Sequence, residues 1–229
     1  MKKITITQIS EKKIKAGNPL LQMEDFPNEL SFDEGELVEL VDSRQKFVAK
    51  AYLAKQNKGV GWVFSLDNAD SVNEAFFKKQ FEKAKRKRTD LQSDPETTTY
   101  RLFNAEGDGI PGVTIDHYDG FAVVSWYSEG IFRYQTAIIA AFQAVFPETK
   151  GIYEKFRYQR KDGLISRYVR GDAAPTPLIV KENGINYATY LDDGLMTGIF
   201  LDQRDVRGAL TERYAAGKRV LNTFSYTGA

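Results

Sequence analysis

The sequence predicts an α+β multidomain protein: a small N-terminal β-barrel, a central α+β unit and the beginning of an α/β domain. Three observations predict this organisation. Residues 1 to about 70 alternate apolar and polar side chains in short runs separated by turn residues, as the strands of a small barrel do. Residues 71–192 mix amphipathic helical stretches with hairpin-like strands. From residue 193 a helical pattern leads into a short apolar run and a glycine turn, which is typical of an α/β fold.

The composition limits the classes of function. The chain has 229 residues, of which 42% are hydrophobic and 28% charged, with a net charge of +1, which suits one to three folded domains. It has no cysteine and a single histidine, His117, which argues against disulfides and against a metal site. The sequence shows neither an apolar run of membrane-spanning length nor a signal peptide, which predicts a cytoplasmic protein without a membrane partner.

The N-terminal 70 residues contain several strand-like runs joined by turn residues. Lys12, Lys13 and Lys15, which lie between the first two of these runs, are interpreted as a solvated face or as a weak contact for RNA. The compact spacing of the runs indicates a barrel. The predicted strands are Ile4 to Gln8, Leu37 to Val41, Phe47 to Leu53 and Val60 to Leu66.

A long amphipathic helix is predicted next, from a capping box at Ser71–Glu74 to about Leu91, with Phe77 and Phe81 on its apolar stripe. Between residues 78 and 88 its other faces carry seven cations and one acid, Glu82. A patch of positive charge attracts phosphate, although an ordinary solvent-facing side of a helix explains this cluster of cations equally well. The candidates for RNA contact here are Lys78, Lys79, Lys85, Arg86, Lys87 and Arg88.

Three strands are predicted after a polar linker: Tyr100 to Phe103, Val113 to Asp116 and Phe121 to Trp126. Glu106 to Gly112 is rich in glycine, but no helix opens directly after it, as a phosphate-binding loop requires. We therefore interpret it as a hairpin connection. No nucleophile accompanies His117, so this histidine is interpreted as structural rather than catalytic.

A second amphipathic helix is predicted over Tyr134 to Val145, followed by a strand over Gly151 to Phe156. Leu178 to Leu191 reads as a hairpin that turns at Asn183-Gly184. The loop after the 151–156 strand interleaves cations with aromatic rings, which suits single-stranded RNA, although a polar edge strand with its loop explains it as well. Its candidates for RNA contact are Arg157, Arg160 and Lys161.

The C-terminal stretch begins with a predicted strand over Thr197 to Leu201. Asp202 is a good N-cap for the helix that follows, whose apolar face runs from Val206 to Tyr214 and which Gly217 terminates. Val220 to Phe224 reads as a strand buried on both faces. Such a strand needs parallel neighbours and covering helices, and the chain supplies none after it, so the α/β domain is expected to be incomplete.

Two segments of this stretch carry a resemblance to a known family. LDQRDVR (201–207) followed by KRVLNTFSYTG (218–228) closely resembles the RlmI-like ribosomal RNA methyltransferases. YRLFNAEGDGIPGVTID (100–116) resembles the central domain of the same family, and the strand order of the N-terminal part resembles its PUA domain. One departure is that Asn18 and Leu20 stand where the family carries His and Trp, which removes a group that could stack on RNA.

The resemblance implies three regions: a PUA-like RNA-binding barrel over 1–70, a central α+β domain over 71–192, and the start of a Rossmann-type class I methyltransferase domain over 193–229. It implies methyl transfer from S-adenosylmethionine to carbon 5 of a cytosine in 23S ribosomal RNA, with this RNA as partner. In the family a cysteine attacks carbon 6 of the base. That cysteine is expected beyond Ala229, so no catalytic residue is expected within the chain and the chain by itself is expected to be inactive.

The resemblance also implies cofactor-binding residues, because in an open α/β sheet a ligand binds beyond the carboxyl end of a strand, at a glycine turn. Two other classes of function stay open: a non-catalytic RNA-binding module, and a methyltransferase of the same fold that acts on guanine or on a small molecule. The oligomeric state also stays open, a homodimer included. The implied contacts to S-adenosylmethionine are Phe224, Ser225, Tyr226, Thr227 and Gly228, with Gln203 and Arg204 as weaker candidates.

Overall fold

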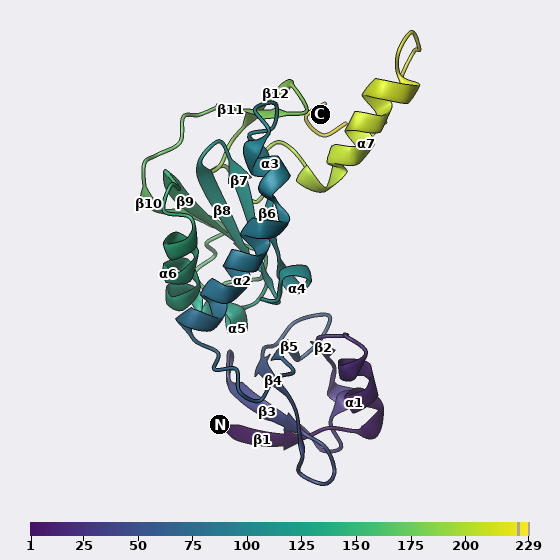
Figure 1. Cartoon of the computed structure of the whole chain (residues 1–229), viewed down its shortest axis with the longest axis vertical. Helices are drawn as coiled ribbons and strands as arrows, with labels where there is room; N and C mark the ends of the chain where they lie inside the picture. Colours follow the sequence, from purple (N-terminus) through teal and green to yellow (C-terminus); the bar gives the residue numbers. More distant parts are fainter. Residues whose placement is uncertain (224, 229) are drawn as a thin grey trace.

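Three β-sheets organise the described part of the chain, residues 1–223 and 225–228 of the computed structural model. In Figure 1 the N-terminal sheet lies below the central sheet, and the C-terminal helix extends away at the upper right. Within these residues no helix is both long enough and apolar enough to cross a bilayer.

The N-terminal sheet has the strand order β1-β3-β4-β5-β2, with β1 parallel to β3 and the other neighbours antiparallel. The predicted strands over 37–41 and 47–53 are confirmed with the same ends. A separate apolar core lies between the sheet and helix α1, around Ile14 and Leu40. The elements are β1 (Lys2–Thr5), α1 (Gln8–Lys15), β2 (Leu20–Leu21), the 3-10 turn η1 (Met23–Asp25), β3 (Leu37–Val41), β4 (Phe47–Leu53) and β5 (Gly61–Ser65).

The first strand is shorter than predicted, because a helix cap interrupts it. The hydroxyl oxygen of Thr7 accepts a hydrogen bond from the backbone N–H of Ser10 at 3.2 Å, so Thr7 is the N-cap of α1. Gln8 is consequently the first residue of a helix, whereas the alternating pattern had placed it on the strand.

The central sheet has the order β10-β9-β8-β7-β6, in which β8 and β9 are parallel because two helices connect them. The glycine-rich turn joins the antiparallel neighbours β6 and β7, as predicted, and contains one helical turn, α4. The elements are α2 (Glu74–Lys87), α3 (Thr89–Ser93), β6 (Thr99–Asn104), α4 (Ala105–Asp108), β7 (Val113–Tyr118), β8 (Phe121–Trp126), α5 (Glu129–Phe132), α6 (Gln135–Val145), β9 (Gly151–Phe156) and β10 (Ser166–Gly171).

Helix α2 begins later and ends earlier than the sequence pattern indicated. Its N-cap is Asn73, whose side-chain oxygen accepts a hydrogen bond from the backbone N–H of Phe76 at 3.1 Å, so the capping box predicted at Ser71 is wrong. Both residue types cap helices, and the local sequence did not discriminate between them. The helix ends at Lys87, and Leu91 belongs to the short helix α3.

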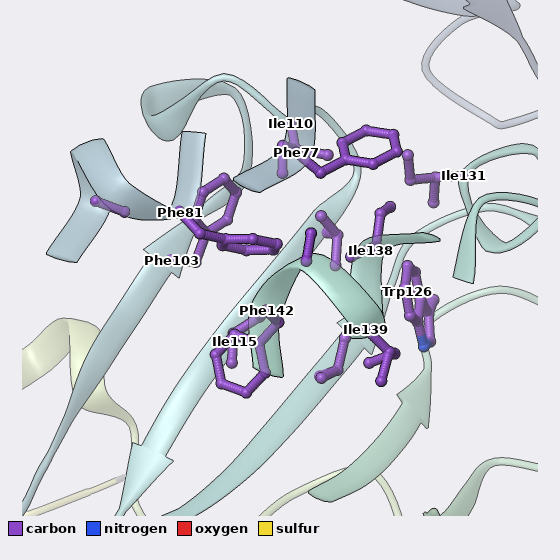
Figure 2. Close-up of a cluster of buried hydrophobic side chains, with 14 of the residues drawn as sticks. Phe77, Phe81, Phe103, Ile110, Ile115, Trp126, Ile131, Ile138, Ile139 and Phe142 are labelled. Carbon is purple, nitrogen blue, oxygen red and sulfur yellow. The ribbon is translucent and has the colours of Figure 1, made fainter. Parts of the chain in front are cut away.

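Helices α2 and α6 cover one face of the central sheet and enclose the largest apolar core (Figure 2). Phe77 and Phe81 of α2 are fully buried there with Phe142 of α6. The same core includes Tyr52 and Trp62 of the N-terminal sheet. The N-terminal unit has β1 and β2 as unpaired edges of its sheet within the described residues and is called the barrel below. This unit and the central sheet therefore share one continuous core and are held against each other by aromatic packing.

The opposite face of the central sheet is covered by the hairpin β11 (Leu178–Glu182) and β12 (Ile185–Thr189) and by the chain that follows it. Asn183 and Gly184 both have positive φ, which confirms the predicted hairpin turn. Ile199 and Leu201 pack into this third core beside Tyr118 of β7.

The C-terminal stretch differs most from prediction. The strand predicted over 197–201 is wrong, since Gly198 has a φ of +105°, a left-handed conformation that a strand does not use. A 3-10 turn, η2 (Leu201–Gln203), precedes the helical segments α7 (Arg204–Ala209) and η3 (Leu210–Tyr214). Gln203, not Asp202, occupies the N-cap position, while the left-handed φ predicted for Gly217 is confirmed.

The strand predicted over 220–224 is also wrong for residues 220–223, which are irregular; Phe224 lies outside the described residues. Leu221 is 85% exposed, and no described strand pairs with this segment. A buried strand requires neighbours for its backbone N–H and C=O groups. The predicted apolar face of the preceding helix is likewise exposed, with Tyr214 at 66%.

Candidate functional site: a polar cleft and a glycine turn

A polar row crosses the central sheet on the face away from α2 and α6. The strand register places five side chains next to one another, and the three in the middle are buried. Sheets bury apolar residues on a covered face, so a polar row that spans all the strands indicates a site rather than a core. The row consists of Asn104, Thr114, Ser125, Lys155 and Ser166.

Lys155 is the charged member of this row and is only 1% exposed. Its ammonium nitrogen donates a hydrogen bond to the backbone oxygen of Gly194 at 2.6 Å. Burial lowers the pKa of Lys155 to about 8, and the neighbouring charge of Arg157 acts in the same direction. The segment that leads into the C-terminal stretch thus lies directly over the polar row.

A cleft of about 950 Å³ opens between the barrel and the end of the central sheet that carries this row. The barrel contributes the exposed β4–β5 connection, and the sheet contributes the carboxyl ends of β8 and β9. Cations, aromatic rings and amides from both units meet here. Among the residues that line the cleft are Lys55, Lys58, Trp62, Arg101, Thr114, Tyr127, Arg157 and Tyr158.

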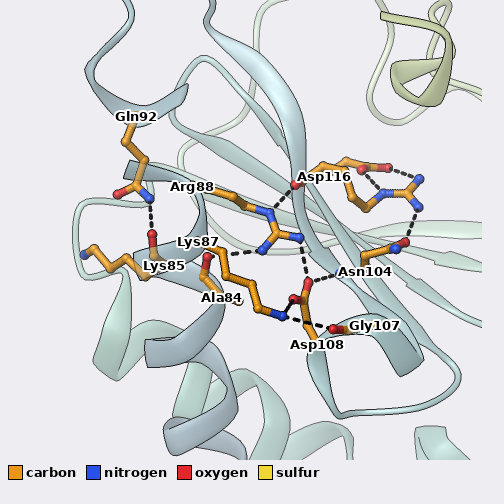
Figure 3. Close-up of polar contacts among 10 residues, drawn as sticks. Ala84, Lys85, Lys87, Arg88, Gln92, Asn104, Gly107, Asp108 and Asp116 are labelled. Carbon is orange, nitrogen blue, oxygen red and sulfur yellow. Dashed lines mark hydrogen bonds and ion pairs between the residues drawn. The ribbon is translucent and has the colours of Figure 1, made fainter. Parts of the chain in front are cut away.

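The predicted cations of α2 include side chains that are bound within the protein, of which Lys87 and Arg88 are shown with their partners in Figure 3. Arg88 and Lys87 both bind the carboxylate of Asp108, at 2.6 and 2.9 Å, and Arg88 also donates to the backbone oxygen of Arg101. Lys85 donates to the backbone oxygen of Val145 at 2.9 Å. Arg88 thus joins the helix to β6, Lys87 joins it to the α4 turn, and Lys85 joins it to α6. The exposed members of the set are Lys78, Lys79 and Arg86, of which Lys79 lies 3.8 Å from the carboxylate of Asp70.

The predicted cations of the β9–β10 loop also differ in their surroundings. Arg160 pairs with Asp162, lies 4.2 Å from the centre of the Phe156 ring and is therefore part of the loop's own structure. Lys161 is exposed. Arg157 lines the cleft, and its Nη1 lies 3.6 Å from the sulfur of Met196.

Of the residues implied for the cofactor, Ser225 to Gly228 form an exposed turn near the end of the described chain, and Phe224 lies outside the described residues. The hydroxyl of Thr227 donates a hydrogen bond to the backbone oxygen of Gly198 at 2.7 Å, and the Tyr226 ring lies 5.3 Å from that of Phe200. Gly228 has a φ of +86°, and no atom lies within 4 Å of the point where a Cβ would be. A backbone of this kind can approach a ligand closely.

The two weaker cofactor candidates lie in a different environment. Gln203 is exposed at the end of η2. The guanidinium of Arg204 donates hydrogen bonds to the side-chain oxygens of Asn183, at 2.8 Å, and Thr97, at 3.2 Å. A ligand carboxylate would have to replace these contacts, which hold the C-terminal stretch on the β11–β12 hairpin.

The contacts of His117 indicate that this residue supports the fold. Its ring stacks on that of Tyr100 at 5.0 Å, and its Nε2 accepts a hydrogen bond from the backbone N–H of Gly120 at 3.2 Å. Burial lowers the pKa of His117 to about 4, although Asp119 and Glu148 act to raise it. The imidazole is therefore neutral at pH 7 and supports the turn between β7 and β8.

This environment makes a pH-dependent contribution to stability. An unfolded chain binds a proton at His117 below about pH 6.5, whereas the folded chain does so only near pH 4. The free energy of unfolding should therefore fall as the pH is lowered from 6.5 to 4. In a His117→Gln variant this component should be missing. Urea denaturation at several pH values measures it, and identical pH profiles for the two proteins would contradict the prediction.

Sequence reasoning missed the barrel side of the cleft and the buried Lys155. Lys55 and Lys58 sit in a short polar turn that has no periodicity to distinguish it from an ordinary loop. For Lys155 a signal was present, because a Glu-Lys pair interrupts the otherwise apolar run of β9. Both members of that pair are buried, which a strand tolerates only where their charges are bound.

Comparison with known proteins identifies relatives that share this architecture. Residues 4–66 match the PUA-like domain family. The whole chain is 44% identical to YwbD of Bacillus subtilis, a ribosomal RNA large subunit methyltransferase by name, and covers 59% of that protein. It is 36% identical over 198 residues to ribosomal RNA large subunit methyltransferase I of Cronobacter sakazakii, which corresponds to 85% of this chain and 50% of that protein.

The chain is homologous to the ribosomal RNA large subunit methyltransferase I family. Two solved structures agree with this relationship. One, from Streptococcus mutans and named as an S-adenosylmethionine-dependent methyltransferase, superposes with a TM-score of 0.91 and 45% identity over 99% of this chain and 58% of its own. The other, SMU.776, is named as a methyltransferase complexed with SAH and superposes with a TM-score of 0.92.

The predicted resemblance and the predicted fold class, α+β with a PUA-like domain, are thereby confirmed. The chain spans between half and three fifths of the length of these relatives.

Proposed function

We propose that the protein functions in transfer of a methyl group from S-adenosylmethionine to a base of large-subunit ribosomal RNA. The observation that carries this proposal is the 44% identity to YwbD over the whole chain. The structure solved with SAH supports the cofactor, because SAH is what S-adenosylmethionine becomes when it has lost its methyl group. A ribosomal RNA substrate implies a cytoplasmic protein.

The finer proposal is methylation of carbon 5 of cytosine. When bound, S-adenosylmethionine supplies an electrophilic methyl group. A thiolate that adds to carbon 6 of cytosine makes carbon 5 nucleophilic toward that methyl group. A base then removes the carbon-5 proton as the bond between carbon 6 and sulfur breaks and the thiolate leaves. None of the 229 residues is a cysteine, so this chain does not supply that thiolate. We propose that its residues bind and orient the RNA and form one side of the cofactor site.

RNA binding and cofactor binding are assigned to different predicted regions of the chain. We propose that residues 1–70 and 71–192 hold RNA and that residues 193–229 contribute to the cofactor site. The turn over Ser225 to Gly228 fits a methionine-type ligand on one side, because Gly228 combines a left-handed backbone with open space around its α-carbon. Arg204 is a weaker contact than the sequence implied, since its guanidinium is already bound.

Replacing Gly228 by valine tests the cofactor site. In a protein that spans the length of the relatives, Gly228→Val should reduce binding of S-adenosylmethionine to background, because a β-branched residue does not adopt the left-handed backbone that the turn requires. Gly217→Val is the matched control, since Gly217 also has a positive φ and open surroundings but lies outside the turn. Calorimetric titration measures binding. Near-normal affinity in a folded Gly228→Val protein would contradict the assignment.

Methyl transfer itself is measured with labelled S-adenosylmethionine and undermodified large-subunit RNA. We expect incorporation by the long protein and mass-spectrometric recovery of 5-methylcytidine. A polypeptide of these 229 residues should give background incorporation only, because it contains no cysteine. Turnover by that polypeptide would contradict the cysteine-dependent route, and a methylated guanine would assign the activity to a different base.

A further inference from the structure

The cleft between the barrel and the central sheet has a wall whose hydrogen-bonding capacity is not used within the chain. Among the described residues, four buried side-chain polar atoms have no hydrogen-bond partner. Three of them, Glu34 Oε2, Thr114 Oγ1 and Arg157 Nε, belong to residues that line this cleft. Native structures contain few such atoms, so their concentration at one place calls for a specific cause.

The guanidinium of Arg157 contacts a weak acceptor, since its Nη1 lies 3.6 Å from the sulfur of Met196. Methionine is unbranched and adapts readily to a new neighbour. An anionic ligand in the cleft would be a stronger acceptor for this guanidinium than the thioether.

The barrel side of the cleft supplies cations without partners. Lys55 and Lys58 are exposed, and neither ammonium group forms a hydrogen bond or an ion pair with a described residue. The acids of the same wall are Glu34, Glu106 and Glu129, and among the described residues only Glu129 has an ion-pair partner, Arg133 at 3.1 Å. Free lysines that face an arginine across a cleft suit a chain of phosphates.

Aromatic rings lie between these cations. Tyr127 and Tyr158, both partly exposed, line the cleft between the lysines of the barrel and Arg157. Rings placed among cations provide stacking surfaces for unpaired bases. The volume of about 950 Å³ is typical of sites that enclose small ligands, which suits single nucleotides rather than a duplex.

A second, smaller cavity continues the cleft along the β9–β10 loop. It has a volume of about 490 Å³ and shares Glu129 and Tyr158 with the larger cleft. Arg133 and Lys161 lie in its wall. Because Glu129 and Tyr158 line both cavities, the two are adjacent, and we call them together the groove. Its lining residues extend from the β4–β5 connection of the barrel to the loop after β9.

We propose that this groove binds a single-stranded segment of RNA, with its phosphates at Lys55, Lys58 and Arg157 and a base stacked on Tyr127. The proposal rests on the proposed function, because it assigns the place where an RNA substrate is held. It places the strand between the two units, and not along the exposed side of α2.

The test uses the 229-residue chain and a fluorescein-labelled single-stranded oligouridylate, with fluorescence anisotropy at several salt concentrations. The double variant Lys55→Gln/Lys58→Gln should weaken binding about tenfold or more at low salt and lower the slope of log affinity against log salt by about 1.4, since each phosphate contact on a single strand contributes about 0.7. The matched control is Arg44→Gln/Lys46→Gln, which removes two exposed charges from the β3–β4 turn, outside the groove. Its affinity should stay within about twofold of the unmodified chain.

A second pair of variants tests the stacking contact. Tyr127→Leu should weaken binding about five- to hundredfold, the range measured for loss of one stacked base, whereas Tyr127→Phe should retain it. An RNA hairpin used in place of the single strand should bind more weakly.

Several outcomes would overturn the proposal: no binding of the oligonucleotide by the unmodified chain, equal losses in the two double variants, or a loss in Lys78→Gln/Lys79→Gln that exceeds the loss in Lys55→Gln/Lys58→Gln. The last result would place the RNA on α2. None of these results bears on methyl transfer or cofactor binding, which are measured separately, so failure of the groove leaves the proposed function standing.

Discussion

Replacing Asp108 by alanine should lower the free energy of unfolding by about 3–5 kcal/mol, because it removes the acceptor of a buried ionic network. The carboxylate is 3% exposed and accepts hydrogen bonds from Arg88 at 2.6 Å, from Lys87 at 2.9 Å and from the backbone N–H of Asn104 at 2.7 Å. Without it the guanidinium of Arg88, itself only 13% exposed, loses its counter-charge. This network ties α2 to the glycine-rich connection between β6 and β7.

Urea denaturation measures this loss. Asp90→Ala is the matched control, since Asp90 is exposed on the neighbouring helix α3, and its effect should stay within about 0.5 kcal/mol. Adding Arg88→Met to Asp108→Ala should recover part of the loss, because the unpaired charge is then removed as well. A loss below about 1 kcal/mol for Asp108→Ala would show that water compensates the network.

The same network predicts sensitivity to acid. Burial alone would raise the pKa of Asp108, but the hydrogen bonds from Arg88, Lys87 and the Asn104 backbone outweigh burial and hold this pKa below its usual range. A carboxyl of this kind stabilises the folded state above its unfolded pKa of about 3.9, and this contribution is lost as the pH falls through the folded value. The difference between the unmodified chain and Asp108→Ala should therefore shrink in strong acid.

Replacing Phe77 by alanine should also cost about 3–5 kcal/mol, because it leaves a cavity at the junction of two units. Phe77 is fully buried, with its ring 6.0 Å from that of Phe64 in the barrel and 6.1 Å from that of Tyr134 beside α6. The change should in addition weaken RNA binding in the groove, since the position of the barrel on the central sheet depends on this packing.

Phe77→Leu is the control, because it keeps most of the apolar volume and should lose clearly less stability. Thermal and urea denaturation give the free energies, and the oligonucleotide assay gives the affinity. A Phe77→Ala protein with the original stability would contradict the view that one aromatic core joins the two units. Unchanged RNA affinity in a destabilised but folded variant would separate the groove from that junction.

Local patterns in the sequence determined most of the elements. The period-two runs over 37–41 and 47–53 became strands with the predicted ends, and Asn183-Gly184 became a tight hairpin turn. These features depend on side-chain alternation and on residues that accept positive φ, which are properties of neighbouring residues. The motifs of the C-terminal stretch, together with residues 100–116, also determined the family resemblance.

Only the tertiary structure decided which cations are available to a partner. In the sequence, Arg88 and Arg204 look like any other basic residues, yet each one is bound within the protein to an acid or an amide that is 20 or 21 residues away along the chain. Lys55 and Lys58, which no pattern singled out, line a cleft with Arg157. The partner of a charged side chain often lies tens of residues away along the chain, and spacing along one helix or strand carries no information about it.

The same reason explains the errors in the C-terminal stretch. An apolar run such as Val220 to Thr223 is compatible with a strand, but a strand forms only where neighbouring strands bind its backbone groups. The run is exposed and unpaired in the described chain, whereas the equally short run over 37–41 is a strand because β1 and β4 flank it. Periodicity determined which residues could be buried, and the presence of hydrogen-bonded neighbours decided which of them were.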